Sequence, residues 1–336
     1  MDRDLGVQIF MHYLSQQGTK MHIVISDDYQ DCVRHLQCFG KLQNHTVEIF
    51  NDTALGIDAL AQRYQNADAI VLIRERTIIN RELLNRLPKL KVISQTGKMA
   101  SHVDLQACKE KGIIVMDGRG SGSATAELNM LLILAALRKL VEEVNRLKEG
   151  RWQGYLGVQL SGKILGVYGF GRIGKQVCEL GKAFGAKPLV WGRPSSLEKA
   201  KQAGYEVAAS KDDFFRESDI VCLQLRLNDE TRGIVKRSDL ALMKDSALLV
   251  NASRAELIED GALESALKEG RPGFAAVDTY ESEPVLGGNH PLLSLPNCLC
   301  TPHIGFVEKD NYEAYFGIAF DNINAYVAGT PQNCVE

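Results

Sequence analysis

The sequence has 336 residues, of which 45% are hydrophobic and 24% are charged, and its formal net charge is −3 at pH 7. This length and composition suit two globular domains, and the slight negative charge excludes the basic field with which nucleic-acid-binding proteins attract phosphates. The longest apolar run, residues 130–137, is too short to span a bilayer. No secretory signal is visible, so we expect a cytoplasmic protein. The eight cysteines form no CxxC pair, which favours reduced thiols in a core over disulfides or a metal site.

Residues 1–20 fit poorly with the pattern of the rest of the chain, and we exclude them from the fold prediction as an N-terminal extension. From residue 21 onward, short β-rich runs alternate with helical patterns. This alternation is typical of parallel sheets with crossover helices. One series of strands is predicted at 22–26, 46–50, 69–73, 90–94 and 113–116, and a second at 163–168, 188–191, 219–225, 246–250, 274–278 and 298–301.

A long helix is predicted between the two series, over residues 124–149. It is apolar on several sides, so more than one surface must bury it. We expect this helix to form the contact of a homodimer; the alternative is a helix buried within one subunit. A last helix is predicted at about 307–328, with an apolar face made of Tyr312, Phe316, Ala319, Ile323 and Tyr326.

Gly169, Gly171 and Gly174 form a GxGxxG motif where the 163–168 strand gives way to a helical pattern. In this strand–turn–helix context the motif predicts a dinucleotide site rather than a glycine-rich turn without a ligand. Gly169 permits a tight turn, Gly171 lets the backbone approach a pyrophosphate, and Gly174 lets the helix pack close to the strand. The N–H groups at the start of the helix then face the phosphates.

The choice of cofactor depends on the end of the next strand. An acidic residue about 20 positions beyond the motif normally binds the ribose hydroxyls of NAD. Here Gly192 occupies that place and Arg193 comes directly after it. Because glycine leaves room for a 2′-phosphate and arginine can pair with it, we favour NADP(H) over NAD(H). In the alternative, Arg193 is solvated and Glu198 replaces the missing acid; we instead assign Glu198 to a capping box with Ser195.

Three polar residues come after strands of the second series: Arg254, Glu283 and His303. Open α/β sheets build their sites at the carboxyl ends of strands. A histidine can transfer an alcohol proton near neutral pH, a neighbouring carboxylate favours its protonated form, and an arginine binds a carboxylate through a bidentate fork. Taken singly, each residue also has an interpretation without catalysis: Arg254 as a solvated strand-end charge, Glu283 as a turn carboxylate before proline, and His303 as a loop histidine with satisfied hydrogen bonds. Together with the dinucleotide motif, they meet the needs of hydride transfer.

From about residue 21 to about residue 331, the chain resembles the D-isomer-specific 2-hydroxyacid dehydrogenase family. The resemblance is carried, in order, by Gly-Phe-Gly-Arg-Ile-Gly at 169–174, Asn-Ala-Ser-Arg at 251–254, Val-Asp-Thr-Tyr at 277–280, Glu-Pro at 283–284 and Thr-Pro-His-Ile-Gly at 301–305. It implies an α/β fold of two doubly wound parallel-sheet domains. A Rossmann nucleotide domain (121–303) would be inserted in a flavodoxin-like substrate domain (21–120 and 304–336).

The resemblance also implies an activity, an NAD(P)-dependent hydride transfer between a D-2-hydroxy acid and its 2-oxo acid, of the glyoxylate, hydroxypyruvate or pyruvate type. Arg254, Glu283 and His303 would be the catalytic trio. For the cofactor, it implies that the backbones of Arg172 and Ile173 lie along the pyrophosphate. The nicotinamide side would be contacted by Ala252, Arg254, Asp278 and Gly305.

For the substrate, the loop at residues 94–99 matches the family loop whose N–H groups hold a carboxylate, and successive loop N–H groups do form anion nests. Gly97, Lys98 and Met99 are therefore candidate substrate-binding residues, beside Arg254 and His303. We add Arg74, which comes after a predicted strand and supplies positive charge for an acid, and leave out Arg76 as a solvated charge. The sequence departs from the family pattern at 98–100 and at Arg226, where the family usually has proline.

Two other functions remain as alternatives. Corepressors of the C-terminal-binding-protein type share this fold and the trio, and act as nucleotide-sensing interaction proteins. We prefer an enzyme because the sequence has no extended partner-binding tail and no low-complexity region. Formate dehydrogenases of the same superfamily carry glutamine where Glu283 stands, because a hydride donor without a hydroxyl proton needs no acid–base pair. Glu283 argues against that activity.

Overall fold

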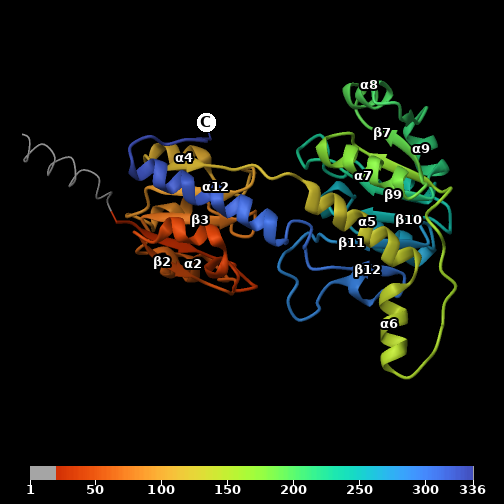
Figure 1. Ribbon diagram of the computed structural model, residues 1–336, viewed down its shortest axis with the longest axis horizontal. Coiled ribbons are helices and arrows are strands. Elements are labelled where there is room, and N and C mark those ends of the chain that lie inside the picture. The colour runs from red at the N-terminus through yellow and green to blue at the C-terminus, as the bar shows by residue number, and fades with distance from the viewer. Residues whose placement is uncertain (1–19, 336) are drawn as a thin grey trace, which may run out of the picture. The chain divides into compact units, whose positions relative to one another are not determined.

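The computed structural model describes residues 20–335, so the predicted extension lies outside the described residues apart from Lys20. The chain divides into two compact units, which Figure 1 shows in ribbon form. Of the described residues, unit 1 holds 20–120 and 309–335, and unit 2 holds 121–308. Unit 2 is therefore one continuous stretch, inserted between the two sequence segments that build unit 1.

Unit 1 is built on a parallel sheet of five strands in the order β2-β1-β3-β4-β5. Its strands are β1 (His22–Ile25), β2 (Thr46–Ile49), β3 (Ala69–Ile73), β4 (Val92–Thr96) and β5 (Ile114–Met116). This is the flavodoxin-type strand order. Every residue of β3 and β4 is buried, as expected for central strands covered on both faces.

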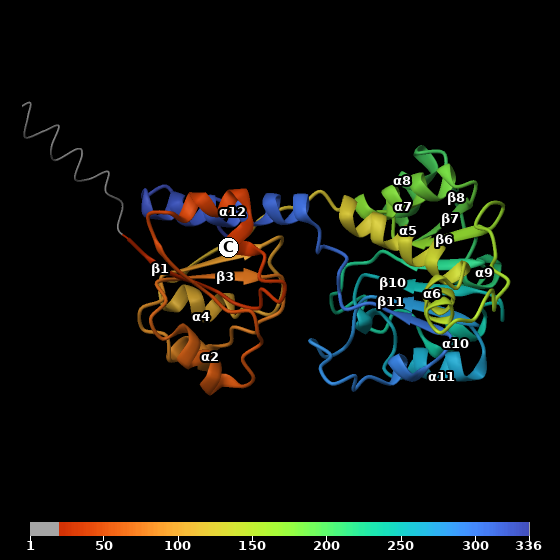
Figure 2. The same ribbon diagram turned by 60° about the horizontal axis from the view of Figure 1, so that its bottom comes forward.

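The helices of unit 1 are α2 (Ile57–Tyr64), α3 (Arg81–Asn85), α4 (Leu105–Glu110) and α12 (Lys309–Val327), with the 3-10 turns η1 (Val33–His35) and η2 (Gln37–Leu42). Figure 2 shows α12 over one face of the sheet and α2 and α4 over the other. The side chains of Phe316, Phe320 and Ile323 in α12 are wholly inaccessible to solvent. The helix predicted at 307–328 is thus confirmed.

Unit 2 is built on a parallel sheet of seven strands in the order β12-β11-β10-β9-β6-β7-β8. Its strands are β6 (Ile164–Tyr168), β7 (Lys187–Trp191), β8 (Glu206–Val207), β9 (Ile220–Leu223), β10 (Leu248–Asn251), β11 (Phe274–Val277) and β12 (Cys298–Cys300). Counted from β6, this is the Rossmann order with one further strand, so the predicted fold is confirmed. The order reverses between β6 and β9, where doubly wound sheets bind nucleotides.

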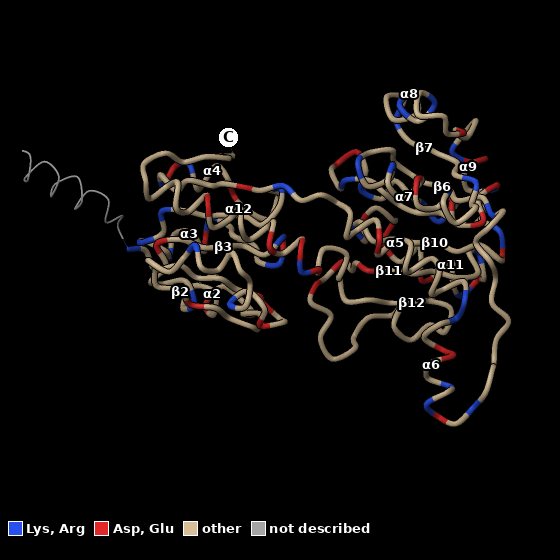
Figure 3. The backbone as a smooth tube through the Cα atoms, viewed as in Figure 1, with Lys and Arg blue, Asp and Glu red and all other residues tan. Residues whose placement is uncertain are grey.

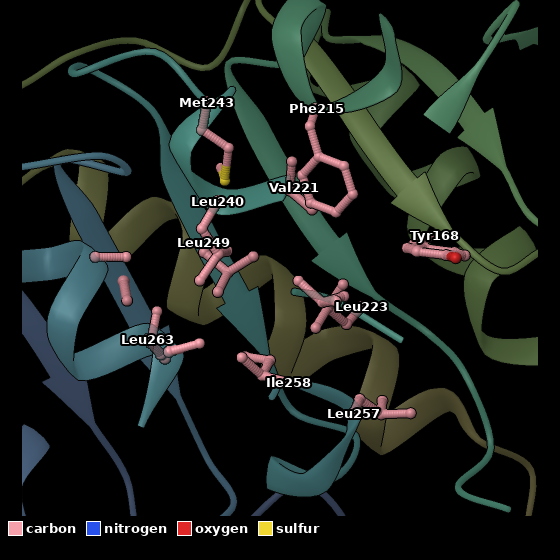
Figure 4. Packing of buried hydrophobic residues seen from close by; sticks show 14 of the residues in the cluster. Tyr168, Phe215, Val221, Leu223, Leu240, Met243, Leu249, Leu257, Ile258 and Leu263 are labelled. Atoms are coloured by element: carbon pink, nitrogen blue, oxygen red, sulfur yellow. The ribbon is translucent and has the colours of Figure 1, made fainter. Parts of the chain in front are cut away.

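The helices of unit 2 are α5 (Ser123–Leu137), α6 (Leu140–Lys148), α7 (Arg172–Ala183), α8 (Pro194–Gln202), α9 (Lys211–Glu217), α10 (Arg237–Ala241) and α11 (Ala262–Glu269), with the 3-10 turns η3 (Ala255–Leu257) and η4 (Pro291–Ser294). One apolar core joins the sheet to α9, α10 and α11 through residues such as Phe215, Val221 and Leu263 (Figure 4). A second core joins the sheet to α5, α7 and α8. Both faces of the sheet are therefore covered.

The single helix predicted over 124–149 is wrong. The chain leaves the helical conformation at Lys139, whose φ is 53°, and continues as α6. The ammonium group of Lys139 lies 3.8 Å from the ring centroid of Phe274 in β11, a cation–π contact that favours this local conformation. α5 and α6 are therefore separate elements with separate exposed faces.

Charged residues of both signs are interspersed along both units, as Figure 3 shows. Neighbouring charges pair on the surface, for example Arg86 with Asp58 and Lys91 with Asp68. Each exposed pair of this kind contributes little stability, about 0–1 kcal/mol. Among residues 20–335, no helix is both long and apolar enough to cross a membrane.

Candidate active site and dinucleotide site

The three glycines of the GxGxxG motif differ in what surrounds them. Gly169 has a φ of 105°, and a Cβ there would lie 2.4 Å from the carbonyl oxygen of Gln224. A Cβ on Gly174 would lie 2.1 Å from the carbonyl oxygen of Gly169. A Cβ on Gly171, by contrast, would meet no atom within 4 Å. Two glycines thus allow close backbone packing, and the third borders open space.

The start of α7 fits the pyrophosphate of a dinucleotide. Gly171 is its N-cap, no side chain caps the helix, and its first turn holds no acidic residue. The side chains of Arg172 and Ile173 lie against Gly122, the N-cap of α5. A Cβ on Gly122 would lie 3.2 Å from the Arg172 side chain and 3.0 Å from the Ile173 side chain. Open space at Gly171, N–H groups without a side-chain cap and the positive end of the helix are features that favour an anion at this position.

The end of β7 carries the residues expected to select the cofactor. A Cβ on Gly192 would lie 3.4 Å from Ser196 and 3.7 Å from Gly169, and Arg193 is exposed. The predicted capping box is wrong: α8 begins at Pro194 with Arg193 as its N-cap, and no side chain caps it. Proline, with its fixed φ, suits the first helical position. Glu198 accepts a hydrogen bond from Gln202 instead, at 2.9 Å.

Glu283 and His303 form a hydrogen-bonded pair in unit 2. Nδ1 of His303 lies 2.5 Å from Oε2 of Glu283, with 22% and 30% of the two side chains exposed. The other oxygen of Glu283 accepts the N–H of Tyr280 at 2.9 Å. His303 has a φ of 51°, a conformation that is rare outside glycine and typical of functional sites. Because Nδ1 faces the carboxylate, Nε2 is the nitrogen that can exchange a proton with a substrate.

Arg254 lies beyond the end of β10, while Glu283 and His303 come after β11 and β12, so the trio occupies the carboxyl ends of three adjacent parallel strands. The carbonyl of Arg254 accepts a hydrogen bond from Asn251 Nδ2 at 2.8 Å, and its Nη1 donates to the carbonyl of Ser253 at 2.6 Å. Its side chain is half-buried. The structure therefore joins Glu283 to His303 directly and places Arg254 at a neighbouring strand end.

Asp278 holds the turn that comes after β12. Its carboxylate accepts hydrogen bonds from Thr301 Oγ1 at 2.6 Å and from the N–H groups of Ile304 and Gly305 at 2.8 Å. Burial raises the pKa of Asp278, and these hydrogen bonds oppose the rise. A Cβ on Gly305 would lie 3.2 Å from Asp278 Oδ2. Asp278 is itself wholly buried, so these hydrogen bonds make it an internal anchor of the turn. Ala252 is buried at the end of β10.

The predicted substrate-binding residues of unit 1 lie around the loop after β4. Gly97 has a φ of 80°, and a Cβ there would lie 2.2 Å from Nη1 of Arg74. Lys98 Nζ pairs with Asp117 Oδ2 at 2.9 Å, and the Met99 N–H donates to the same oxygen at 3.0 Å. The Met99 side chain is buried in the core. Met99 therefore anchors the loop, and Gly97 and Lys98 are its better candidates for binding an anion.

Tyr280 and Thr301 hydrogen-bond to the segments that carry Glu283 and His303. We predicted no role of its own for either residue from the sequence. Tyr280 Oη donates to the carbonyl of Thr301 at 3.0 Å, while its N–H binds Glu283. Thr301 in turn binds Asp278 through its hydroxyl. The signal in the sequence was their position within Val-Asp-Thr-Tyr and Thr-Pro-His, the segments that bear the site. Their side chains fix the segments on which Glu283 and His303 stand.

Three comparisons with known proteins agree. The family model for D-isomer specific 2-hydroxyacid dehydrogenase, NAD binding domain, matches residues 130–305. The D-3-phosphoglycerate dehydrogenase of Methanocaldococcus jannaschii is 35% identical over 311 residues, which are 91% of this chain but 57% of that protein. The glyoxylate reductase of Aeropyrum pernix is 37% identical over 291 residues, which are 83% of this chain and 86% of that one.

Among solved structures, a phosphoglycerate oxidoreductase from Vibrio cholerae O395 matches with a TM-score of 0.90 and 49% identity, over 92% of this chain and 99% of that one. The chain therefore spans little more than half of one relative and nearly all of another. The sheet order, the glycine turn and the motif matches all agree with these similarities. This chain belongs to the D-isomer specific 2-hydroxyacid dehydrogenase family.

Proposed function

We propose that the protein reduces a small 2-oxo acid to the D-2-hydroxy acid with NAD(P)H, and catalyses the reverse oxidation. The observation that carries the proposal is the 2.5 Å contact between His303 Nδ1 and Glu283 Oε2. A histidine held in this way by a carboxylate is suited to general acid–base catalysis on an alcohol. Glyoxylate, hydroxypyruvate and pyruvate are the proposed substrates.

Each residue of the trio has one task in this reaction. Bound nicotinamide supplies or accepts the hydride. In the reductive direction His303 gives a proton from Nε2 to the substrate oxygen, and in the oxidative direction it takes that proton back. Glu283 orients the imidazole and stabilises its charge. Arg254 binds the substrate carboxylate through its guanidinium fork. In unit 1, Gly97, Lys98 and Arg74 are the proposed substrate-binding residues, as the resemblance of their loop to the family loop implies.

A substrate panel tests the activity. NAD(P)H consumption is measured with glyoxylate, hydroxypyruvate and pyruvate for the wild type, His303→Ala, Glu283→Gln and Arg254→Ala. We expect His303→Ala to lose most of kcat, and Arg254→Ala to raise KM as well as lower kcat, because the fork to the carboxylate is lost. Wild-type turnover in His303→Ala would contradict the mechanism. Nucleotide binding without turnover of any acid would favour the corepressor-like alternative.

For the cofactor we propose a preference for NADP(H). The proposal is supported by Gly192 at the usual place of the acid and by the exposed Arg193 beside it. Because Glu198 forms no capping box, it stays available as a substitute for the acidic residue that binds the ribose of NAD. Glu198→Gln is therefore measured beside Arg193→Ala. We expect Arg193→Ala to lower kcat/KM for NADPH by roughly tenfold or more, the effect of losing one charge-assisted hydrogen bond. A preference for NADH that neither substitution alters would refute this choice.

We also propose a homodimer, built on α5, α6 and the segment after them. The support is a set of large apolar side chains in this stretch that are 42–97% exposed: Leu131, Leu140, Val141, Val144, Leu147, Trp152, Tyr155, Leu156 and Val158. Apolar surface of this extent is typical of a protein interface. A second copy of the chain, which presents the same stretch, can cover it by two-fold symmetry.

A further inference from the structure

The segment that carries Glu283 begins and ends in a second histidine–carboxylate pair. Nε2 of His290 lies 2.9 Å from Oε2 of Glu281. Between these two residues the chain makes a largely exposed excursion that includes Gly287 and Gly288, both with positive φ. Such a loop gains order chiefly from contacts at its ends. The pair therefore closes the loop on which Glu283 stands.

The hydrogen bonds of His290 fix its tautomer. Nδ1 accepts the N–H of Leu292 at 3.3 Å and thereby caps η4. Nδ1 then carries no proton, so Nε2 carries it and donates to Glu281. The side chain of His290 is 15% exposed, against 50% for Glu281. The ring of His290 also meets the ring of Tyr280 edge to face, with centroids 4.9 Å apart. His290 is thus held in one orientation and packs on Tyr280.

Tyr280 connects this second pair to the proposed catalytic pair. Its N–H donates to Glu283 Oε1 at 2.9 Å, and its hydroxyl donates to the carbonyl of Thr301 at 3.0 Å. Thr301 precedes His303 by two residues, and Glu283 Oε2 reaches His303 Nδ1. One residue therefore holds both the carboxylate and the strand end that carries the histidine. Tyr280 itself is buried.

We propose that Tyr280, Glu281 and His290 form a clasp that positions Glu283 against His303. The inference rests on the proposed function and names further positioning residues for it. His290 touches none of the reacting atoms; it fixes the ring of Tyr280 and closes the loop through Glu281. Without the clasp, the carboxylate of Glu283 turns away from Nδ1 and the imidazole loses its orientation. Misplacement of a catalytic group by about 1 Å can lower the rate about a hundredfold.

Variants of His290 test the clasp through turnover. We expect His290→Ala to lower kcat about tenfold or more, with KM for the cofactor changed less than twofold, because the dinucleotide turn lies elsewhere in unit 2. His290→Gln restores most of kcat, since its amide N–H can still reach Glu281. His290→Asn restores little, since its oxygen can replace only the acceptor for Leu292. Glu281→Ala, at a half-exposed position, provides a second way to open the clasp without a core substitution.

The chain supplies a matched control in unit 1. His45 has the same bonding pattern, with Nδ1 accepting the Met21 N–H at 3.3 Å and Nε2 lying 3.0 Å from Asn324 Oδ1. His45→Ala should leave kcat within twofold of wild type. Equal losses of kcat in His45→Ala and His290→Ala, or unchanged kcat in both His290→Ala and Glu281→Ala, overturn the clasp. Rescue by His290→Asn but not by His290→Gln also overturns it, because the cap of η4 would then be the cause.

A spectroscopic measurement separates the clasp from the proposed function. The proton between His303 Nδ1 and Glu283 gives a downfield NMR signal that is assigned by its loss in His303→Gln. We expect this signal in the wild type and in His45→Ala, and its loss or broadening in His290→Ala and Glu281→Ala. If the wild type turns over no 2-oxo acid but the signal behaves in this way, the clasp stands and the proposed function fails. A signal unchanged in both clasp variants overturns the clasp, whatever the activity.

Discussion

Replacement of Gly174 by alanine tests whether the glycine turn is held by close backbone packing. The added Cβ would lie 2.1 Å from the carbonyl oxygen of Gly169, whereas real Cβ atoms essentially never come within 3.0 Å of another heavy atom. The start of α7 must therefore retreat from the turn by about 0.9 Å. Both atoms in conflict belong to or adjoin the backbone, so no side-chain rotation relieves it. Overpacking of this kind costs about 1–3 kcal/mol.

Two measurements characterise the Gly174→Ala variant. A cost near the upper end of that range lowers the melting temperature by roughly 6–12 °C for a unit of this size. The displaced helix also presents its N–H groups less well to the pyrophosphate, so we expect Kd for NADPH to rise roughly tenfold or more, equivalent to about 1.4 kcal/mol. Differential scanning fluorimetry and fluorescence titration measure the two effects.

Gly171→Ala is the matched variant, because its Cβ meets no atom within 4 Å and the backbone of Gly171, with φ −87°, suits alanine. We expect its melting temperature to stay close to that of the wild type, while its Kd for NADPH rises because the methyl group enters the space for the cofactor. Gly40→Ala, with similarly open surroundings in unit 1, should change neither quantity. Unchanged stability and affinity in Gly174→Ala would refute this account of the turn.

Three further predictions concern charge, thiol reactivity and assembly. Burial raises the pKa of Asp219, but hydrogen bonds from Lys244 and the Ile164 N–H outweigh it and hold the pKa below 3.8. The carboxylate of Asp219 therefore stabilises the fold at any pH above its pKa in the unfolded chain, and this stabilisation is lost as the pH falls through its pKa in the folded protein. Asp219→Asn should lower the melting temperature at neutral pH and have little effect on it in acid. A difference in melting temperature between wild type and variant that does not change with pH would contradict this. Burial raises the pKa of Cys222 to about 12, so a thiol reagent at mildly alkaline pH should modify the exposed Cys334 at once and Cys222 only after unfolding. Light scattering should give about twice the 37.1 kDa of one chain. Leu147→Asp should yield monomers, whereas the control Leu55→Asp, at a still more exposed leucine, should not. A wild type that is monomeric at micromolar concentration rules out the dimer.

Most of the fold can be predicted from local patterns in the sequence. Each predicted strand is present, with ends that differ by no more than two residues, because buried parallel strands form apolar runs that polar turns interrupt. The strand β8 was missed, since its two residues, Glu206–Val207, are too short for a pattern and pair only through contact with β7. The break at Lys139 was missed for a similar reason. It coincides with a contact to Phe274, far along the chain, and no glycine or proline marks it.

The site divides in the same way. Strand-end positions pointed to Glu283 and His303, and the structure brings the two side chains together. The use of Met99 and Asp278 as internal anchors was not predictable, because it depends on which way backbone N–H groups point after a turn. The predicted capping box of Ser195 and Glu198 is wrong because the helix begins two residues earlier, at Pro194, with Arg193 as its N-cap. The residue types of Glu283 and His303 were enough to predict their chemistry. The hydrogen-bond partners of Met99 and Asp278 depend on the geometry of the turns, which the sequence does not show directly.

The discontinuity of unit 1 sets the order in which the chain can fold during synthesis. Its five strands are all synthesised before unit 2 begins, yet α12 is synthesised only after the whole of unit 2. Until then, the sheet face that receives Phe316, Phe320 and Ile323 has no cover. Unit 2 is continuous and can bury its own cores as it emerges, so the part synthesised second is completed first. The nascent chain therefore carries an open apolar sheet through most of its synthesis, the kind of surface that chaperones bind.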